Sequence, residues 1–187
     1  MPVVRVNDAT FADLKSLATW LNTSTPSDTI DRAVQMAMGS LGMVRDTGQD
    51  AALGDDESEL MLFDATPGLA FTKPITASVN GKQIPRPTWV GILLSVIKEA
   101  KKHTSHPIQL AREMNIPAKA EKYEKDGYKY YPDLGISVQG QSAHDAWREI
   151  ERLATRWHIA VNVEFIWRQN PKAQHPGKRG ALSVGRT

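Results

Sequence analysis

The chain has 187 residues, 24% of them charged, a formal net charge of +2 and no cysteine. That length suits one ordinary domain or two small ones, and the missing cysteines exclude disulfides, thiol catalysis and cysteine–zinc sites. No apolar run reaches the roughly 18 residues of a membrane span, and no signal peptide is recognised, so we expect a cytoplasmic protein without a membrane partner.

The charges are unevenly distributed along the chain. Residues 1–66 carry a net charge of −7, whereas residues 67–187 carry a net charge of +9. An acidic part joined to a basic part favours two regions with different partners.

The first forty residues predict a short strand followed by two helices. Apolar and polar residues alternate from Val3 to Asn7, as they do in a half-exposed strand. Asp8 is a suitable N-cap for the first helix, and Thr25 before Pro26 marks the start of the second. The apolar positions recur at helical spacing, at Phe11, Leu14, Leu17, Ala18 and Leu21 and then at Ile30, Ala33, Val34, Ala37 and Leu41.

A lone strand and two apolar stripes cannot satisfy their hydrogen bonds and bury their side chains within about forty residues. A second copy of the chain would supply both, with the two strands paired antiparallel across a twofold axis. The alternative is a strand that pairs within its own monomer. The residues expected to pair the two chains are Val4, Val6, Leu14, Leu17, Ile30 and Val34.

This segment resembles the ribbon-helix-helix superfamily of the MetJ, Arc and CopG type. "VVRVND", the helix after it and "TPSDTIDRAV" carry the resemblance, which covers residues 3–41. It implies a ribbon in the major groove, where Arg5 would read guanine and Asn7 adenine. Residues 1–41 have a net charge of only −1, and DNA affinity comes largely from cations that neutralise phosphates. We therefore expect residues 1–42 to act mainly in dimerisation.

Residues 43–66 predict an acidic linker. The stretch "MVRDTGQDAALGDDESEL" holds three clusters of acids and a single base, which is typical of a flexible tether. Because "ESELMLF" turns apolar, a short helix near residues 57–63 is the alternative.

Residues 67–187 predict a small α+β domain with an antiparallel or mixed sheet. Asn80-Gly81 is a strong signal for a two-residue hairpin turn. The apolar periodicity predicts amphipathic helices in residues 88–103 and 142–157, a short helix from Pro107, and strands at residues 135–138 and 159–167.

Cations gather in the tail that begins at Arg168, which holds five bases and no acid. Clustered like charges repel unless an anion is present, so we interpret the tail as a loop or hairpin that contacts phosphates; the alternative is a solvated tail. The residues expected to contact DNA are Arg5, Asn7, Asn80, Lys82, Arg86, Arg168, Lys172, Lys178 and Arg179.

A pairing segment, a linker and a basic DNA-binding domain together look like the SeqA-type replication modulators. "TPSDTIDRAV" is similar to their second N-terminal helix, and "VNGKQ" is similar to a loop that contacts DNA there. The resemblance implies that Asn80 and Lys82 contact DNA. The strand–helix–strand extension after residue 133 departs from that family, so the likeness is architectural and does not extend to the reading of methylated adenine.

No catalytic or cofactor motif is recognised, whether phosphate loop, dinucleotide glycine motif or nucleophile elbow. His103 and His106 have H-x-x-H spacing, and we interpret them as surface or capping residues of a Lys-rich helix end rather than metal ligands. His144 and His158 flank an amphipathic helix and are expected in core or boundary packing, and His175 in the basic tail is expected to be exposed or to contact a phosphate. The helix at residues 142–157 intersperses its acids with arginines, which predicts weak ion pairs among Asp145, Arg148, Glu149, Glu151 and Arg152. The four tyrosines between residues 123 and 131 suit either stacking on bases or packing on a sheet.

The sequence therefore predicts a dimeric, non-enzymatic DNA-binding regulator of transcription or replication that needs no cofactor or metal and is nucleoid-associated in the cytoplasm. One alternative is a ribbon-helix-helix repressor or antitoxin whose ribbon reads an operator through Arg5 and Asn7 and whose C-terminal domain holds a protein partner. A second alternative is a nuclease subunit assembled from scattered acids and histidines.

Overall fold

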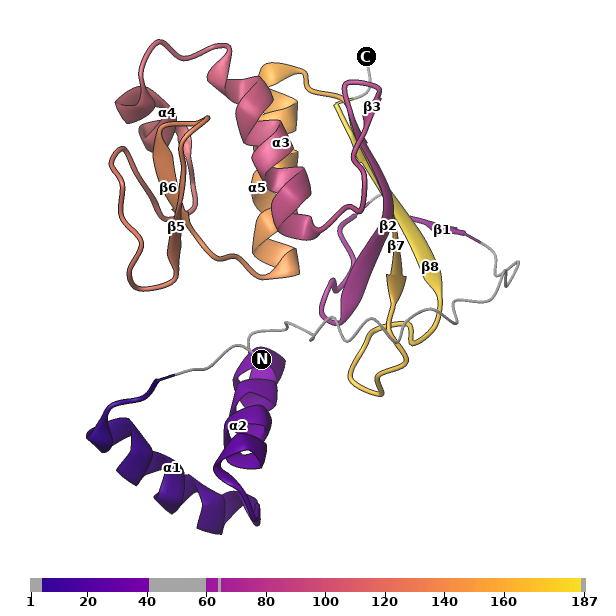
Figure 1. The fold of residues 1–187 in the computed structure, drawn as a ribbon. Helices are drawn as coiled ribbons and strands as arrows, with labels where there is room; N and C mark the ends of the chain where they lie inside the picture. Colours follow the sequence, from indigo (N-terminus) through magenta and orange to yellow (C-terminus); the bar gives the residue numbers. More distant parts are fainter. Residues whose placement is uncertain (1–4, 41–59, 64, 186–187) are drawn as a thin grey trace. The chain divides into compact units, whose positions relative to one another are not determined.

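The computed structural model describes residues 5–40, 60–63 and 65–185, and the chain divides into two compact units, Met1–Ala52 and Leu53–Thr187. The described residues form five helices and two sheets, which confirms the predicted α+β class (Figure 1). The second unit begins earlier than the predicted domain at residue 67, and most of the predicted linker lies outside the described residues.

The first unit consists of two helices, α1 (Asp8–Leu21) and α2 (Pro26–Ser40), as predicted. Asn7 caps α1, because its side chain accepts a hydrogen bond from the Thr10 amide at 2.8 Å. The predicted cap, Asp8, instead lies in the first turn, where a carboxylate complements the helix dipole. Thr25 caps α2 as predicted, since the Asp28 amide donates to its Oγ1 at 3.2 Å.

The predicted N-terminal strand is not formed by the described residues of one chain. Val3 and Val4 lie outside them, and Arg5, Val6 and Asn7 belong to no strand. Asn7 has the extended dihedrals φ −78° and ψ 167° of an N-cap residue. Because a strand needs a neighbour for its backbone hydrogen bonds, the ribbon stays a prediction about two chains.

The second unit contains a five-stranded sheet with the strand order β1-β8-β7-β2-β3. β1 runs parallel to β8, and the other neighbours are antiparallel. Asn80 and Gly81 close the predicted hairpin with φ values of 48° and 76°, the left-handed pair that a type I′ turn requires. The strands are β1 (Met61–Leu62), β2 (Thr72–Val79), β3 (Lys82–Gln83), β7 (Val161–Trp167) and β8 (Arg179–Val184).

Two segments belong to this sheet that the sequence did not assign to it. One was predicted to be part of the linker, and the other, the basic tail, was predicted to be either a loop or a hairpin. β1 lies inside the predicted linker, where the alternative was a helix. Hydrogen bonds also fix the residues that follow β1: the Trp147 indole donates to Thr66 Oγ1 at 3.1 Å, and the Trp167 indole donates to the Gly68 carbonyl at 2.8 Å. The basic tail returns as β8 along β7. The hairpin interpretation of the tail is therefore confirmed, and its contact with phosphates stays a prediction.

The second unit has three layers (Figure 1). Helices α3 (Trp89–Lys101) and α5 (Ala143–Trp157) cover one face of the five-stranded sheet. The third layer lies on the other side of these helices and holds α4 and a three-stranded antiparallel sheet. Its elements are α4 (Pro107–Glu113), β4 (Ala118–Lys119), β5 (Tyr128–Tyr131) and β6 (Ile136–Gln139).

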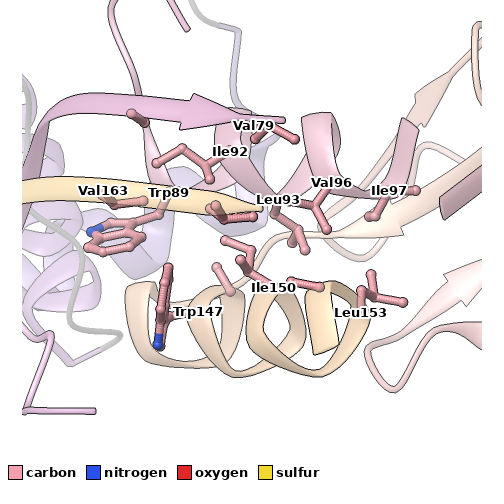
Figure 2. Close-up of a cluster of buried hydrophobic side chains, with 14 of the residues drawn as sticks. Val79, Trp89, Ile92, Leu93, Val96, Ile97, Trp147, Ile150, Leu153 and Val163 are labelled. Atoms are coloured by element: carbon pink, nitrogen blue, oxygen red, sulfur yellow. The ribbon is translucent and has the colours of Figure 1, made fainter. Parts of the chain in front are cut away.

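The core lies between the five-stranded sheet and the two helices (Figure 2). Every predicted core position of α3 is buried, and so are the central positions of α5. Both helices start at polar caps, since Thr88 Oγ1 accepts from the Gly91 amide at 3.0 Å and Ser142 Oγ from the Asp145 amide at 3.1 Å. The buried residues contributed by α3 and α5 are Trp89, Ile92, Leu93, Val96, Ile97, Ala100, Ala146, Trp147, Ile150, Leu153 and Ala154.

Candidate nucleic-acid interface and pairing surface

One face of the five-stranded sheet points away from α3 and α5, and we call it the open face. Its composition follows from register, because residues paired across strands point to the same side. Asn162 of β7 pairs with Ser78 of β2 and with Ser183 of β8, and Gln83 of β3 pairs with Ser78. The intervening residues of β7 point into the core: Val161, Val163, Phe165 and Trp167 are buried.

Charged side chains occupy the other end of the open face. Lys73 of β2 and Arg179 of β8 are both in register with Ile166 of β7. Arg179 Nη2 donates to Glu164 Oε2 at 3.0 Å, and both side chains are 37% exposed. Glu164 is the one acid among the described strand residues of this face. Its pairing leaves the face without an unneutralised negative charge.

The loop between β7 and β8 presents further cations at this end. The Arg168 amide donates to the Phe71 carbonyl at 2.8 Å, and the Trp167 amide to the Lys178 carbonyl at 3.0 Å, so both ends of the loop are held by backbone hydrogen bonds. Lys172 and Lys178 are exposed, and neither ammonium has an ion-pair partner among the described residues. The loop is therefore an anchored platform for exposed positive charge.

His175 anchors this loop from within, although the sequence suggested an exposed residue or a phosphate ligand. Its ring is half-buried and stacks on Phe63 at 6.2 Å between centroids, with the edge of Trp167 at 4.9 Å. Gly180 permits this aromatic cluster, because a Cβ there would lie 2.8 Å from Phe165 Cζ and 3.0 Å from a Phe63 ring carbon.

At the opposite end of the sheet, Asn80 uses both ends of its amide inside the fold. Its Nδ2 donates to Glu99 Oε2 at 3.1 Å, and its Oδ1 accepts from the Ala160 amide at 3.0 Å. Glu99 also accepts from Lys102 at 2.7 Å, and these two hydrogen bonds, that from Lys102 above all, lower the pKa of Glu99. The Asn80 amide therefore ties the hairpin to α3 and to the start of β7, while Lys82 and Arg86 remain exposed.

The predicted DNA-binding residues do not form one cluster. The hairpin group (Asn80, Lys82 and Arg86) and the loop group (Arg168, Lys172, Lys178 and Arg179) lie at opposite ends of the sheet. The seven residues of β7 separate them, a span of about 20 Å at 3.3 Å per residue. Arg5 and Asn7 belong to the other compact unit.

The open face connects the two groups through polar residues that the sequence reasoning missed. Gln83, Asn162 and Ser183 are exposed there. The alternation of "IAVNVEFIW" already indicated that Asn162 and Glu164 point away from the core. Their alignment with Ser183 and Arg179 depends on strand register, which no local pattern specifies.

The pairing surface lies on the first unit, whose two helices leave large apolar side chains in solvent. Trp20 is 89% exposed, and Phe11 and Met36 are also exposed. Of the residues predicted to pair two chains, Leu14 is buried at 8% exposure between the helices, and Val4 lies outside the described residues. The remaining four predicted residues are 38–41% exposed: Val6, Leu17, Ile30 and Val34.

The tyrosines and the paired histidines serve the packing of the second unit. Lys119 Nζ lies 3.2 Å from the ring centroid of Tyr123 and 5.0 Å from that of Tyr128, a cation–π arrangement within the chain. The His103 ring stacks on Trp157 at 4.7 Å, and His106 takes the N-cap position of α4 without a side-chain hydrogen bond. The histidine roles therefore agree with the predicted surface and capping interpretation.

The described residues contain neither a metal-binding cluster nor a membrane-spanning helix. Nowhere in residues 5–40, 60–63 and 65–185 do three His, Asp or Glu side chains gather in a group that could hold a metal ion. In the same ranges, no helix combines the length and the apolar character needed to cross a bilayer.

Comparisons of the chain with protein-family models, curated proteins and solved structures found no match.

Proposed function

We propose that the protein is a homodimeric DNA-binding regulator, in which the first unit pairs two chains and the second unit supplies most of the DNA affinity. The observation that carries the proposal is the anchored loop between β7 and β8, which holds Lys172 and Lys178 exposed near the Arg179–Glu164 ion pair. Neither lysine has a carboxylate partner in the part of the chain that the structure describes. Fixed like charges repel one another, and a phosphate backbone relieves this repulsion.

Duplex DNA fits this surface better than a single strand does. Proteins that bind single strands stack bases on aromatic side chains, and no described strand residue of the open face is aromatic. The rings near the loop, Phe63, Trp167 and His175, are packed against one another instead.

Affinity for DNA should depend on salt through the loop cations. In the full chain, Lys172→Ala with Lys178→Ala removes two phosphate contacts from each chain and four from the proposed dimer, so the slope of log affinity against log salt should become shallower by about 3.6, at about 0.9 per phosphate. The measurement is fluorescence anisotropy with a labelled duplex of mixed sequence at several salt concentrations. Arg112→Ala with Lys125→Ala removes the same charge from exposed residues of the third layer and should leave the slope unchanged. Equal changes in both variants would contradict a specific surface.

Pairing through the first unit is supported by its size and its exposed apolar side chains. The first unit, Met1–Ala52, is small, and domains below about 70 residues have cores of limited stability that a disulfide, a metal or a partner commonly reinforces. The described helices bury only Leu14 and Thr29. A second copy would cover Leu17, Ile30 and Val34, which one chain leaves about 40% exposed.

Sedimentation equilibrium of the full chain tests this pairing. The wild type should be a dimer at micromolar concentration, whereas Ile30→Asp with Val34→Asp should be a monomer, because two carboxylates would be buried unpaired in the interface. Gln35→Asp on the same helix is the matched control and should stay dimeric, since Gln35 is an exposed polar residue. A monomeric wild type, or a dimeric double variant, would overturn the pairing.

A second candidate function reverses the roles of the two units. The predicted N-terminal ribbon, with Arg5 and Asn7, would read an operator, and the second unit would bind a protein partner. A hollow of about 300 Å³ between α3 and the β5–β6 turn favours it, because Leu94, Tyr131 and Leu134 give it apolar walls. Arg5→Ala distinguishes the candidates. Loss of sequence-specific binding with an unchanged salt slope supports the ribbon as the reader.

A further inference from the structure

We infer that the antiparallel ribbon of β7 and β8 enters the major groove of duplex DNA, and that Asn162 and Arg179 on its outward side determine sequence specificity. The inference rests on the proposed DNA-binding function and adds the element that reads the bases. It is carried by the register of the ribbon and by the hydrogen-bonding capacity that its outward side chains retain.

The outward side of the ribbon carries side chains that have partners on base edges. Register places Asn162 beside Ser183, Glu164 beside Ala181, and Ile166 beside Arg179. In the major groove, Asn pairs with adenine, Arg with guanine, and Glu accepts from cytosine. β2 flanks β7 along its whole length, so the surface that meets DNA is three strands wide. At about 4.8 Å between neighbouring strands these three span about 10 Å, which fits a groove about 12 Å wide.

The spacing along the ribbon matches the spacing of base pairs. Outward residues two positions apart are about 6.6 Å apart at 3.3 Å per residue, and two base-pair steps measure about 6.8 Å. Asn162 and Arg179 are separated by two such intervals, because Arg179 pairs with Ile166. The ribbon would therefore read an adenine and a guanine about four base pairs apart.

Asn162 is held ready for such a contact. The Ser183 hydroxyl lies 2.9 Å from Asn162 Oδ1, to which it can donate its hydrogen bond. A carbonyl oxygen has two lone pairs, so Oδ1 can also accept from an adenine amino group. Asn162 Nδ2 has no partner among the described residues and is free to donate to adenine N7. The Asn80 amide, in contrast, has a partner inside the fold at both its nitrogen and its oxygen.

Arg179 is oriented by Glu164 and keeps donors in reserve. Arg179 Nη2 donates to Glu164 Oε2 at 3.0 Å, and Nη1 has no hydrogen-bond partner in the described part of the chain. Nε is buried, so the donors available to a base are those of Nη1 and the second hydrogen of Nη2. A carboxylate beside the arginine repels phosphates but tolerates base edges, which favours correct sites over the DNA backbone. Glu164 therefore acts as a positioning residue for Arg179.

Charge complementarity identifies the occupant of the open face as DNA. Lys82 and Arg86 lie at one end of the ribbon's sheet, and Lys172 and Lys178 lie at the other. Cations at both ends contact the two phosphate backbones, while the polar middle faces the bases.

The test is a selection by the full-length protein from duplexes randomised over 20 base pairs. The wild type should enrich a site with an adenine and a guanine about four base pairs apart. Asn162→Ala should reduce discrimination at the adenine position about tenfold, and Arg179→Lys should do so at the guanine position, because lysine keeps the charge but loses the bidentate fork. In both variants discrimination should fall further than binding to mixed-sequence DNA, because Lys172 and Lys178 are unchanged. Glu164→Gln should raise that binding while lowering discrimination.

Gln83→Ala is the matched control, because Gln83 is an exposed amide of the same face outside the ribbon; it should leave the enriched site unchanged. If the wild type binds DNA with the expected salt slope but enriches no sequence, or if Asn162→Ala and Arg179→Lys retain the site, the inference fails and the proposed function stands. If duplex DNA is not bound, or single strands or a protein occupy the face instead, both fail.

Discussion

Trp167→Ala is expected to lower the free energy of unfolding of the second unit by about 4 kcal/mol, the cost of emptying a large aromatic site in a core. Trp167 is fully buried at the end of β7, where it contacts Phe63, Phe165 and His175. Its indole Nε1 donates to the Gly68 carbonyl at 2.8 Å. The change therefore leaves both a cavity and an unpaired carbonyl, and it loosens the start of the cationic loop.

Urea denaturation followed by circular dichroism measures this loss. Trp167→Phe retains a six-membered ring but loses the hydrogen bond and part of the indole volume, so its cost should be about half as large. Val90→Ala on α3, at 37% exposure, is the control and should change stability by no more than about 0.5 kcal/mol. A Trp167→Ala loss no larger than that of the control would show that the aromatic cluster contributes little. Weaker DNA binding by folded Trp167→Ala would connect the cluster to the loop.

Glu149→Ala is expected to destabilise the second unit by about 3 kcal/mol, because it leaves the partner of a buried ion pair uncompensated. Glu149 is 2% exposed on α5, and its Oε1 accepts from Arg152 Nη2 at 2.7 Å and from the Asn115 amide at 2.9 Å. Arg152 also donates to the Glu113 carbonyl. The Glu149–Arg152 pair therefore connects α5 to the end of α4. The hydrogen bond from Arg152 to Glu149 raises the pKa of Arg152.

Glu151→Ala is the matched control for this prediction. Glu151 is an exposed carboxylate on the same helix, so its removal should cost less than about 0.5 kcal/mol. The two variants are compared by urea denaturation at neutral pH. Equal losses would mean that the buried pair is replaceable, which contradicts the role assigned to it. The sequence treats both acids as members of weak helical ion pairs, because burial cannot be read from charge spacing.

The positions of the core residues follow from local periodicity. The six apolar residues predicted for residues 88–103 are the six buried residues of α3, and the alternation of residues 159–167 agrees with the burial pattern of β7. Helical and strand periods are properties of neighbouring residues, so one sequence is enough to detect them. The type I′ turn at Asn80-Gly81 is equally local.

Other features depend on residues that lie far apart in the chain. β1 contributes only Met61 and Leu62, and its parallel partner β8 follows more than a hundred residues later, so no local pattern could reveal it. His144 and His158 were expected at a packing boundary, but both are exposed at the ends of α5. The Asn80 side-chain amide forms hydrogen bonds with Glu99 and Ala160, which come close to it only in the folded unit.

The sequence by itself determined the α+β class, the helices, the hairpin, the inward residues and the division into an acidic and a basic part, because propensity, periodicity and charge act over short distances. Only the tertiary structure decided which outward residues share a surface. Strand register aligned Asn162 with Ser183 and Glu164 near Arg179, and it separated the hairpin cations from the loop cations. Register is set by long-range backbone pairing and core packing, which no single segment contains.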